Sequence, residues 1–172
     1  PTDTVYTICC SLENKKGLKK LYDIKEGKHH FSILLNDLSN ISTYTGNFDR
    51  SVFKLLNRYL PGPYTFILPA SQKIAKAFGT KKKTVGIRIP NNDIVRQIIE
   101  YLGHPLACTS VNDEDEILEY TSDPNEIAAN MEDVVELIVD GGYGSNDPTT
   151  VVDCTVSPVE IIREGAGEKI VL

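Results

Sequence analysis

The chain has 172 residues, 41% of them hydrophobic and 24% charged, which is ordinary for a globular protein and most simply fits one domain with its own core. Its net charge of −6 argues against nucleic-acid affinity spread over the whole surface. No apolar run approaches the roughly 20 residues needed to span a bilayer, so we expect no membrane partner.

The first half of the chain predicts strands that alternate with helices. In residues 14–24, Leu18, Leu21 and Tyr22 fall on one helical face, while most lysines fall on the others. Asp49 is placed to cap a helix that Pro61 and Gly62 end. We therefore expect strands at 5–10, 31–35 and 64–68, and helices at 14–24 and 50–60.

The second half continues the alternation. Asn92 or Asp93 begins a helix that Gly103 ends, and Asp123-Pro-Asn-Glu126 has the capping pattern of another short helix. We expect strands at 84–89, 106–110, 134–139, 150–153 and 159–163. The result is an α/β protein, and the short loops between several strands favour a mixed sheet.

The cysteines indicate a cytoplasmic location. Cys9, Cys10, Cys108 and Cys154 show no Cys-x-x-Cys spacing and lie in apolar, strand-like runs, so we expect buried, reduced thiols. Because residue 1 is Pro1, the sequence leaves open whether a targeting segment precedes it.

The run Thr84-Val-Gly-Ile-Arg-Ile-Pro90 holds the most distinctive charged residue. Alternation along a strand places Thr84, Gly86 and Arg88 on one face, opposite three apolar side chains. A guanidinium beside a glycine and a hydroxyl suits a carboxylate or phosphate ligand. From this segment alone, an exposed strand face in water is an equal alternative.

Polar or glycine-rich motifs recur at the ends of the apolar strands. Hydroxyls, an amide and an arginine from separate strands are suited to orienting a small polar ligand. Neither a Walker loop nor Gly-x-Gly-x-x-Gly occurs, and no Ser-His-Asp pattern is evident. The motifs are PTDTVY, PGPYT, TVGIRIP, PLACTSVN, IVDGGY, PTTVVD and IIREGAG.

Together and in this order, these motifs resemble the YrdC-like family, whose best-known members are threonylcarbamoyl-adenylate synthases. The resemblance implies one YrdC-like domain over residues 1–172, with the family's opening strand missing before residue 1. It also implies a twisted mixed sheet flanked by helices around a deep, positively charged cavity. Family members convert L-threonine, bicarbonate and ATP to threonylcarbamoyl-AMP and pyrophosphate, for N6-threonylcarbamoyladenosine at position 37 of tRNA.

The resemblance also implies roles for individual residues. It assigns threonine binding to Thr2, Thr4, Arg88, Ser110 and Thr149. It assigns ATP binding to Lys25, Lys28, Thr84, Asn112, Thr121 and Arg163. Mg²⁺ is the implied counter-ion of the phosphates, although no Asp or Glu of the motifs is an obvious ligand.

Two segments depart from the family pattern and resemble the YciO-like branch. Gly27 stands where the family's Lys-x-Arg has arginine, and Lys28 replaces it only partly because an ammonium lacks the bidentate fork. The acidic run 113–116 follows Asn112, where it would repel a triphosphate. An RNA- or nucleotide-binding protein with weak or no synthase activity, and with tRNA or double-stranded RNA as partner, therefore remains the alternative.

Overall fold

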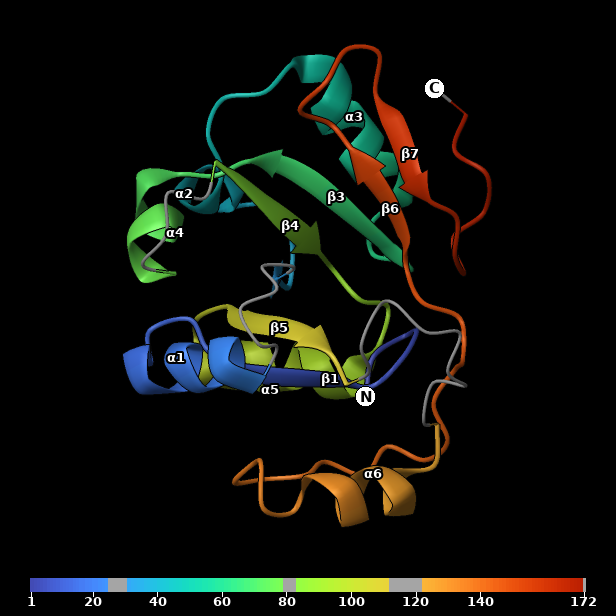
Figure 1. The fold of residues 1–172 in the computed structure, drawn as a ribbon. Helices are drawn as coiled ribbons and strands as arrows, with labels where there is room; N and C mark the ends of the chain where they lie inside the picture. The colour runs from blue at the N-terminus through green and yellow to red at the C-terminus, as the bar shows by residue number, and fades with distance from the viewer. Residues whose placement is uncertain (25–30, 79–82, 112–121, 172) are drawn as a thin grey trace.

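The computed structural model describes residues 1–24, 31–78, 83–111 and 122–171, which form a twisted seven-stranded sheet with helices around it (Figure 1). The strand order is β1-β5-β2-β4-β3-β6-β7. The pairs β2–β4 and β3–β6 are parallel and the other four are antiparallel, so the predicted mixed sheet is confirmed. The strands are β1 (Thr7–Ser11), β2 (Ser32–Leu34), β3 (Tyr64–Pro69), β4 (Thr84–Arg88), β5 (Leu106–Ser110), β6 (Thr150–Asp153) and β7 (Glu160–Arg163).

The helices begin at the capping signals that the sequence contains. The Asn92 side chain accepts hydrogen bonds from two backbone N–H groups of its helix, and Asp123 accepts one from Asn125. Gly103 ends its helix with φ of 70°, as a left-handed cap requires. Asp49 holds the expected position, but its side chain makes no capping bond. The helices are α1 (Lys15–Ile24), α2 (Ile41–Tyr44), α3 (Arg50–Tyr59), α4 (Gln72–Ala77), α5 (Asp93–Leu102) and α6 (Pro124–Met131).

The predicted strand at 134–139 is wrong. The backbone N–H groups of Val134 and Val135 donate to the carbonyl of Met131, which continues the end of α6 as a turn. Leu137 is 78% exposed. Figure 1 places this segment beside α6, apart from the sheet, so the apolar run has no neighbouring strand with which to pair. Helices α2 and α4 were not predicted, because four and six residues are too few for a clear helical period.

Strand alternation divides the sheet into two faces. One carries Ile33, Phe66 and Ile87, all fully buried in the main core together with residues of α1 to α4. On the other, Leu34 and Leu106 pack against Val95 and Ile99 of α5, among other residues. Helix α5 covers only part of this second face, and the remainder bears the polar side chains described below.

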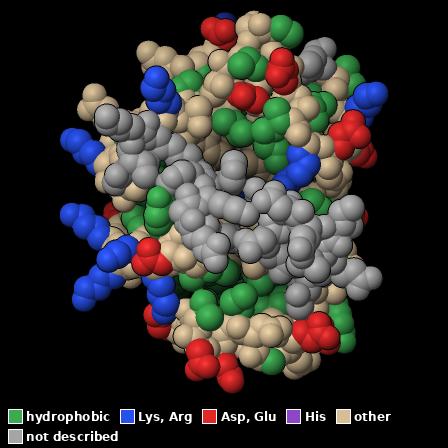
Figure 2. Space-filling model, in the orientation of Figure 1, with side chains coloured by type: hydrophobic (Ala, Val, Ile, Leu, Met, Phe, Trp, Pro, Cys, Tyr) green, Lys and Arg blue, Asp and Glu red, His purple; other side chains and the backbone are tan. Residues whose placement is uncertain are grey.

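Charge is unevenly distributed over the surface. Helix α1 exposes Lys15, Lys16, Lys19 and Lys20, and Figure 2 shows Lys and Arg side chains along the left edge, on the side where α1 lies. Acidic side chains gather at the bottom of the same view, near α6. None of the helices in the described ranges is long and apolar enough to cross a membrane.

Candidate functional site: a polar cavity on the sheet

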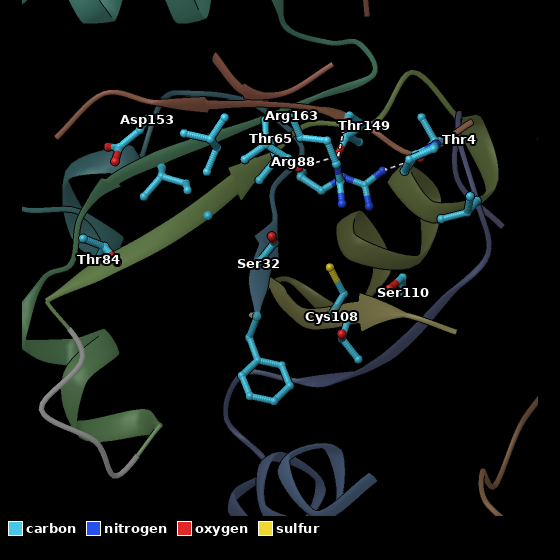
Figure 3. A pocket seen from close by; sticks show the side chains of 18 residues that line it. Thr4, Ser32, Thr65, Thr84, Arg88, Cys108, Ser110, Thr149, Asp153 and Arg163 are labelled. Carbon is cyan, nitrogen blue, oxygen red and sulfur yellow. Dashed lines mark hydrogen bonds between the residues drawn. The ribbon is translucent and has the colours of Figure 1, made fainter. Parts of the chain in front are cut away.

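A cavity of about 480 Å³ lies on the face of the sheet that α5 leaves uncovered (Figure 3). Strands β2 to β7 and the segment before β1 supply its described lining. Its volume is in the range of sites for small molecules. Thr84 and Arg88 stand at the two ends of β4, four residues or about 13 Å apart. Both line the cavity, which therefore extends along the length of β4.

Arg88 is buried in the cavity wall and not exposed on a strand face. Thr84, Gly86 and Arg88 all line the cavity, which confirms the predicted alternation along β4. Arg88 is only 6% exposed. Because a buried charge is costly without partners, this position is consistent with a specific anion site. The exposed-strand alternative for Arg88 is thereby excluded.

The segment before β1 supplies the partners of Arg88. Its Nη2 donates to Thr4 Oγ1 at 2.9 Å and to Thr2 Oγ1 at 3.3 Å. Both threonines are buried, and their hydroxyls lie 3.1 Å apart. Asp3 Oδ1 lies 3.6 Å from the same Nη2. Arg88 Nε is buried without a hydrogen-bond partner in the described part of the chain.

A second cluster joins β3, β7 and the start of β6. Thr65 and Thr149 are buried with their hydroxyls 2.8 Å apart. Arg163 donates from Nε to the Thr149 carbonyl at 3.1 Å and from Nη2 to Thr149 Oγ1 at 3.2 Å. Neighbouring Thr150 instead accepts from the N–H groups of Gly165 and Gly167, so its hydroxyl organises the segment after β7 and does not face a ligand.

The cavity therefore brings together most of the predicted site residues that lie in the described ranges. Thr4, Thr84, Arg88, Ser110, Thr149 and Arg163 line it. Thr2 is buried behind this lining and reaches it through its contact with Arg88. The predicted ATP-binding residues Lys25, Lys28, Asn112 and Thr121 lie outside the described residues, as does Gly27.

Sequence reasoning missed several residues of this site. Ser32, Thr65 and Cys108 line the cavity but were not singled out. Alternation along their strands was the available signal. Ile67 lies opposite Gly86 of β4, and Thr65, two residues before Ile67, points to the same face of the sheet. Asp3 lay between two predicted site threonines, but only the fold shows that it contacts Arg88.

One acidic side chain, Asp153 of β6, belongs to the described lining. Its Oδ1 accepts from the N–H of Thr155 at 2.8 Å and from the Thr155 hydroxyl at 2.6 Å. Among the described residues no three His, Cys, Asp or Glu gather into a metal site. This set fits a Mg²⁺ ion held mainly by phosphates and water, with Asp153 as one available oxygen ligand.

The fold and the motifs agree with those of known proteins. A protein-family model for Sua5, YciO and YrdC, described as "Telomere recombination", matches residues 1–165. The chain belongs to the Sua5/YciO/YrdC family. The resemblance to YrdC-like proteins, inferred from the motifs, is thereby confirmed.

Within this family the chain is similar to both YciO proteins and synthases. "Uncharacterized protein YciO" of Escherichia coli is 37% identical over 98% of this chain and 82% of its own length, and its crystal structure superposes with a TM-score of 0.86. A "putative threonylcarbamoyl-AMP synthase" of Methanocaldococcus jannaschii is 31% identical over 95% of this chain and 77% of its own. The Pyrococcus abyssi Sua5 structure complexed with L-threonine shares the fold, with a TM-score of 0.85, 24% identity, and 96% of this chain against 49% of its own.

Proposed function

We propose that this protein is an L-threonylcarbamoyladenylate synthase-like nucleotidyltransferase, which joins L-threonine, bicarbonate and ATP into threonylcarbamoyl-AMP and pyrophosphate. Its product would serve the N6-threonylcarbamoyladenosine-37 modification of tRNA in the cytoplasm. Named synthases at 31% and 27% identity within the same family support this proposal.

The observation that carries the proposal is the buried guanidinium of Arg88 at one end of the cavity. Its Nη2 is held by threonine hydroxyls, while Nε is left without a partner among the described residues. The planar fork of a guanidinium matches two oxygens of a carboxylate or of a phosphate. In this proposal Arg88 binds the carboxylate of L-threonine, and Thr4, Ser110 and Thr149 supply hydroxyls around the amino acid.

The rest of the cavity would then take the nucleotide. Arg163 is a second cation on the wall, and Thr84 lies at the opposite end of β4 from Arg88. Lys25, Lys28, Asn112 and Thr121 complete the proposed ATP site from outside the described residues. Mg²⁺, when bound, would neutralise phosphate charge, with Asp153 as an available ligand.

The chemistry that follows depends on positioning. The amine of the held threonine attacks the carbon of bicarbonate, whose hydroxyl leaves as water with a proton from the amine, to give a carbamate. A carbamate oxygen then displaces pyrophosphate from the α-phosphorus of ATP. Arg88 fixes one end of the amino acid, so that the carbamate formed at its amine points along the cavity toward the phosphates. Proximity of this kind, together with cations that neutralise the phosphates, accounts for most of the catalysis in phosphoryl transfer.

The deciding experiment is a pyrophosphate-release assay with ATP, Mg²⁺ and bicarbonate, with and without L-threonine. We expect release that requires threonine and bicarbonate together and is lost in Arg88→Ala. L-Serine and L-valine serve as controls, since they remove the methyl and the hydroxyl of threonine respectively. Pyrophosphate release that is equal with and without threonine would exclude the proposed reaction.

A second function, binding of RNA or nucleotide without synthesis, is favoured by the exposed lysines of α1. It predicts RNA affinity that falls steeply with salt and with neutralisation of Lys15, Lys16, Lys19 and Lys20 or of residues 81–83. Comparison with heparin binding separates specific RNA recognition from general affinity for polyanions. Affinity for tRNA or double-stranded RNA no greater than for heparin would count against this second function.

A further inference from the structure

Cys9 and Cys108 face one another across two neighbouring strands. Antiparallel β1 and β5 pair Cys9 directly with Cys108. The N–H of Val111 donates to the carbonyl of Tyr6, so residues 6 and 111 form a hydrogen-bonded pair. Because the two kinds of pair alternate, residues 9 and 108, three positions further along, form a non-hydrogen-bonded pair with Cα atoms about 4.5 Å apart.

This spacing suits a disulfide. Bridged cysteines have Cα atoms about 4.4–6.8 Å apart, and directly opposed side chains point to the same face of a sheet. Adjacent Cys10 is different, because it pairs with Ala107 and points to the other face, next to Gly17 of α1. The register therefore selects one pair from four cysteines that are all free in this structure.

The two thiols also differ in acidity in the way that disulfide formation needs. A hydrogen bond from Cys108 lowers the pKa of Cys9 against the opposing effect of burial, with smaller contributions from Thr7 and the positive charge of Arg88. The same contact, together with burial, raises the pKa of Cys108. Burial raises the pKa of Cys10 to about 11 and that of Cys154 to about 12. Cys9 is thus the most readily ionised of the four thiols, with a protonated partner beside it.

The pair lies beside the cavity. Cys108 is only 1% exposed but belongs to the cavity lining, and Figure 3 shows its sulfur below Arg88. Cys9 is half-buried, and both cysteines pack in the apolar cluster against α5. Cys108 is therefore the point at which the pair meets the cavity.

We propose that Cys9 and Cys108 form a redox-active dithiol site, which closes to a reversible disulfide on reaction with a hydroperoxide such as hydrogen peroxide. The Cys9 thiolate attacks one peroxide oxygen, giving a sulfenic acid and releasing the other oxygen as water after protonation. The Cys108 sulfur then attacks the Cys9 sulfur, its proton leaves with the sulfenic hydroxyl as a second water, and the S–S bond forms. Two thiols lose two electrons in total and one peroxide gains them. An external thiol reverses the reaction by exchange.

The bond would tie β1 to β5 and close a loop of about 100 residues between Cys9 and Cys108. Closing a loop of this length restricts the unfolded chain, and for a protein of this size we expect the midpoint of thermal unfolding to rise by roughly 10 °C. The site does not depend on which ligand the cavity takes, so its test is independent of the proposed synthase reaction.

The test treats the reduced protein with one equivalent of hydrogen peroxide, blocks remaining thiols with an alkylating reagent, and maps the products by mass spectrometry. We expect a monomer 2 Da lighter, a linked peptide pair containing Cys9 and Cys108, and two thiols still free to alkylate after unfolding. Dithiothreitol should restore both the mass and the lower thermal midpoint. Cys9→Ser and Cys108→Ser should each abolish the linked pair, whereas Cys10→Ser and Cys154→Ser should retain it.

The disulfide map of the wild-type protein tests the proposal even if a serine variant folds poorly. A linked pair involving Cys10 or Cys154, a disulfide between two molecules, or persistent oxidation to sulfinic acid without the pair would overturn the proposal. So would a wild-type protein whose four thiols all remain alkylatable after the peroxide has been consumed.

Discussion

The carboxylate of Asp3 and the guanidinium of Arg88 form a buried ion pair beside the cavity. Asp3 Oδ1 lies 3.6 Å from Arg88 Nη2, and the two side chains are 9% and 7% exposed. The other carboxylate oxygen of Asp3 accepts the N–H of Asn91, just beyond the end of β4, at 2.9 Å. Asp3 therefore holds the segment before β1 against the end of β4 while it partly neutralises the arginine that faces the cavity.

Arg88→Ala should lower the free energy of unfolding by about 3–5 kcal/mol, because it leaves the Asp3 carboxylate buried without its cation. Adding Asp3→Asn should recover part of this loss, since an amide is neutral and still accepts from Asn91. Urea unfolding of the wild type, both single variants and the double variant measures the coupling directly. Additive losses in the double variant would mean that the pair does not interact in the folded protein.

Under the proposed function, Arg88→Ala should also weaken L-threonine binding by about 2–5 kcal/mol, because the carboxylate of the amino acid loses a desolvated partner. Arg88→Lys is the matched control, since it keeps the charge but removes the planar fork. We expect Arg88→Lys to retain stability better than it retains binding. Calorimetric titration with L-threonine measures both affinities, and a lysine variant with wild-type affinity would contradict a bidentate contact.

Gly86→Ala tests the closest approach in the cavity wall. A Cβ at Gly86 would lie 2.5 Å from Ser32 Oγ and 3.1 Å from Thr65 Cγ2. Forcing in that methyl group should cost about 1–3 kcal/mol of stability and reduce ligand binding, because Ser32 must move within the cavity. A second change, Ser32→Gly, removes the clashing side chain and should restore part of the stability. Thermal unfolding with and without ligand checks both effects, and a fully stable, fully binding Gly86→Ala would show that the wall adapts freely.

Thr149→Val should weaken ligand binding more than Thr149→Ser does. The hydroxyl of Thr149 accepts from Arg163 and lies against Thr65, so valine leaves the buried Thr65 hydroxyl and one N–H of the half-buried Arg163 without this partner. The expected cost is about 1–3 kcal/mol in affinity or stability, whereas serine retains the oxygen. Titration of ATP and L-threonine against the three proteins measures the difference. Equal affinities for the valine and serine variants would indicate that the hydroxyl serves neither ligand nor Arg163.

The sequence predicted the part of the site that a single strand determines. The alternation in Thr84–Arg88 is a property of one strand, so it identified the face that became the cavity wall. It could not decide between water and a cavity for Arg88, because that depends on the segment before β1 and on β7, which are distant in sequence. The family resemblance supplied that missing information.

What the sequence could not predict depends on pairing between distant segments. The apolar run 134–139 has the composition of a strand, yet composition does not reveal whether a sheet edge is available, and Leu137 is instead exposed. The pairing of Cys9 with Cys108 follows from β1 lying beside β5. The contact of Asp3 with Arg88 arises because the segment before β1 reaches the end of β4. Local patterns encode neither arrangement. Polar side chains at long sequence separation are therefore the residues that local reasoning missed.

Stability should fall as the pH rises through the alkaline range, in part because of Cys154. Burial raises the pKa of this thiol from 9.0 to about 12 in the folded protein. Between these values the folded state holds a proton that the unfolded state has released, so the free energy of unfolding decreases as pH rises. Urea unfolding from pH 8 to pH 11 should show a steeper fall for the wild type than for Cys154→Val, which has no thiol to titrate. Cys154→Val should keep a shallower fall, because burial also raises the pKa of Cys10, to about 11. Parallel curves for the wild type and Cys154→Val would mean that the Cys154 thiol ionises as easily in the folded protein as in the unfolded chain.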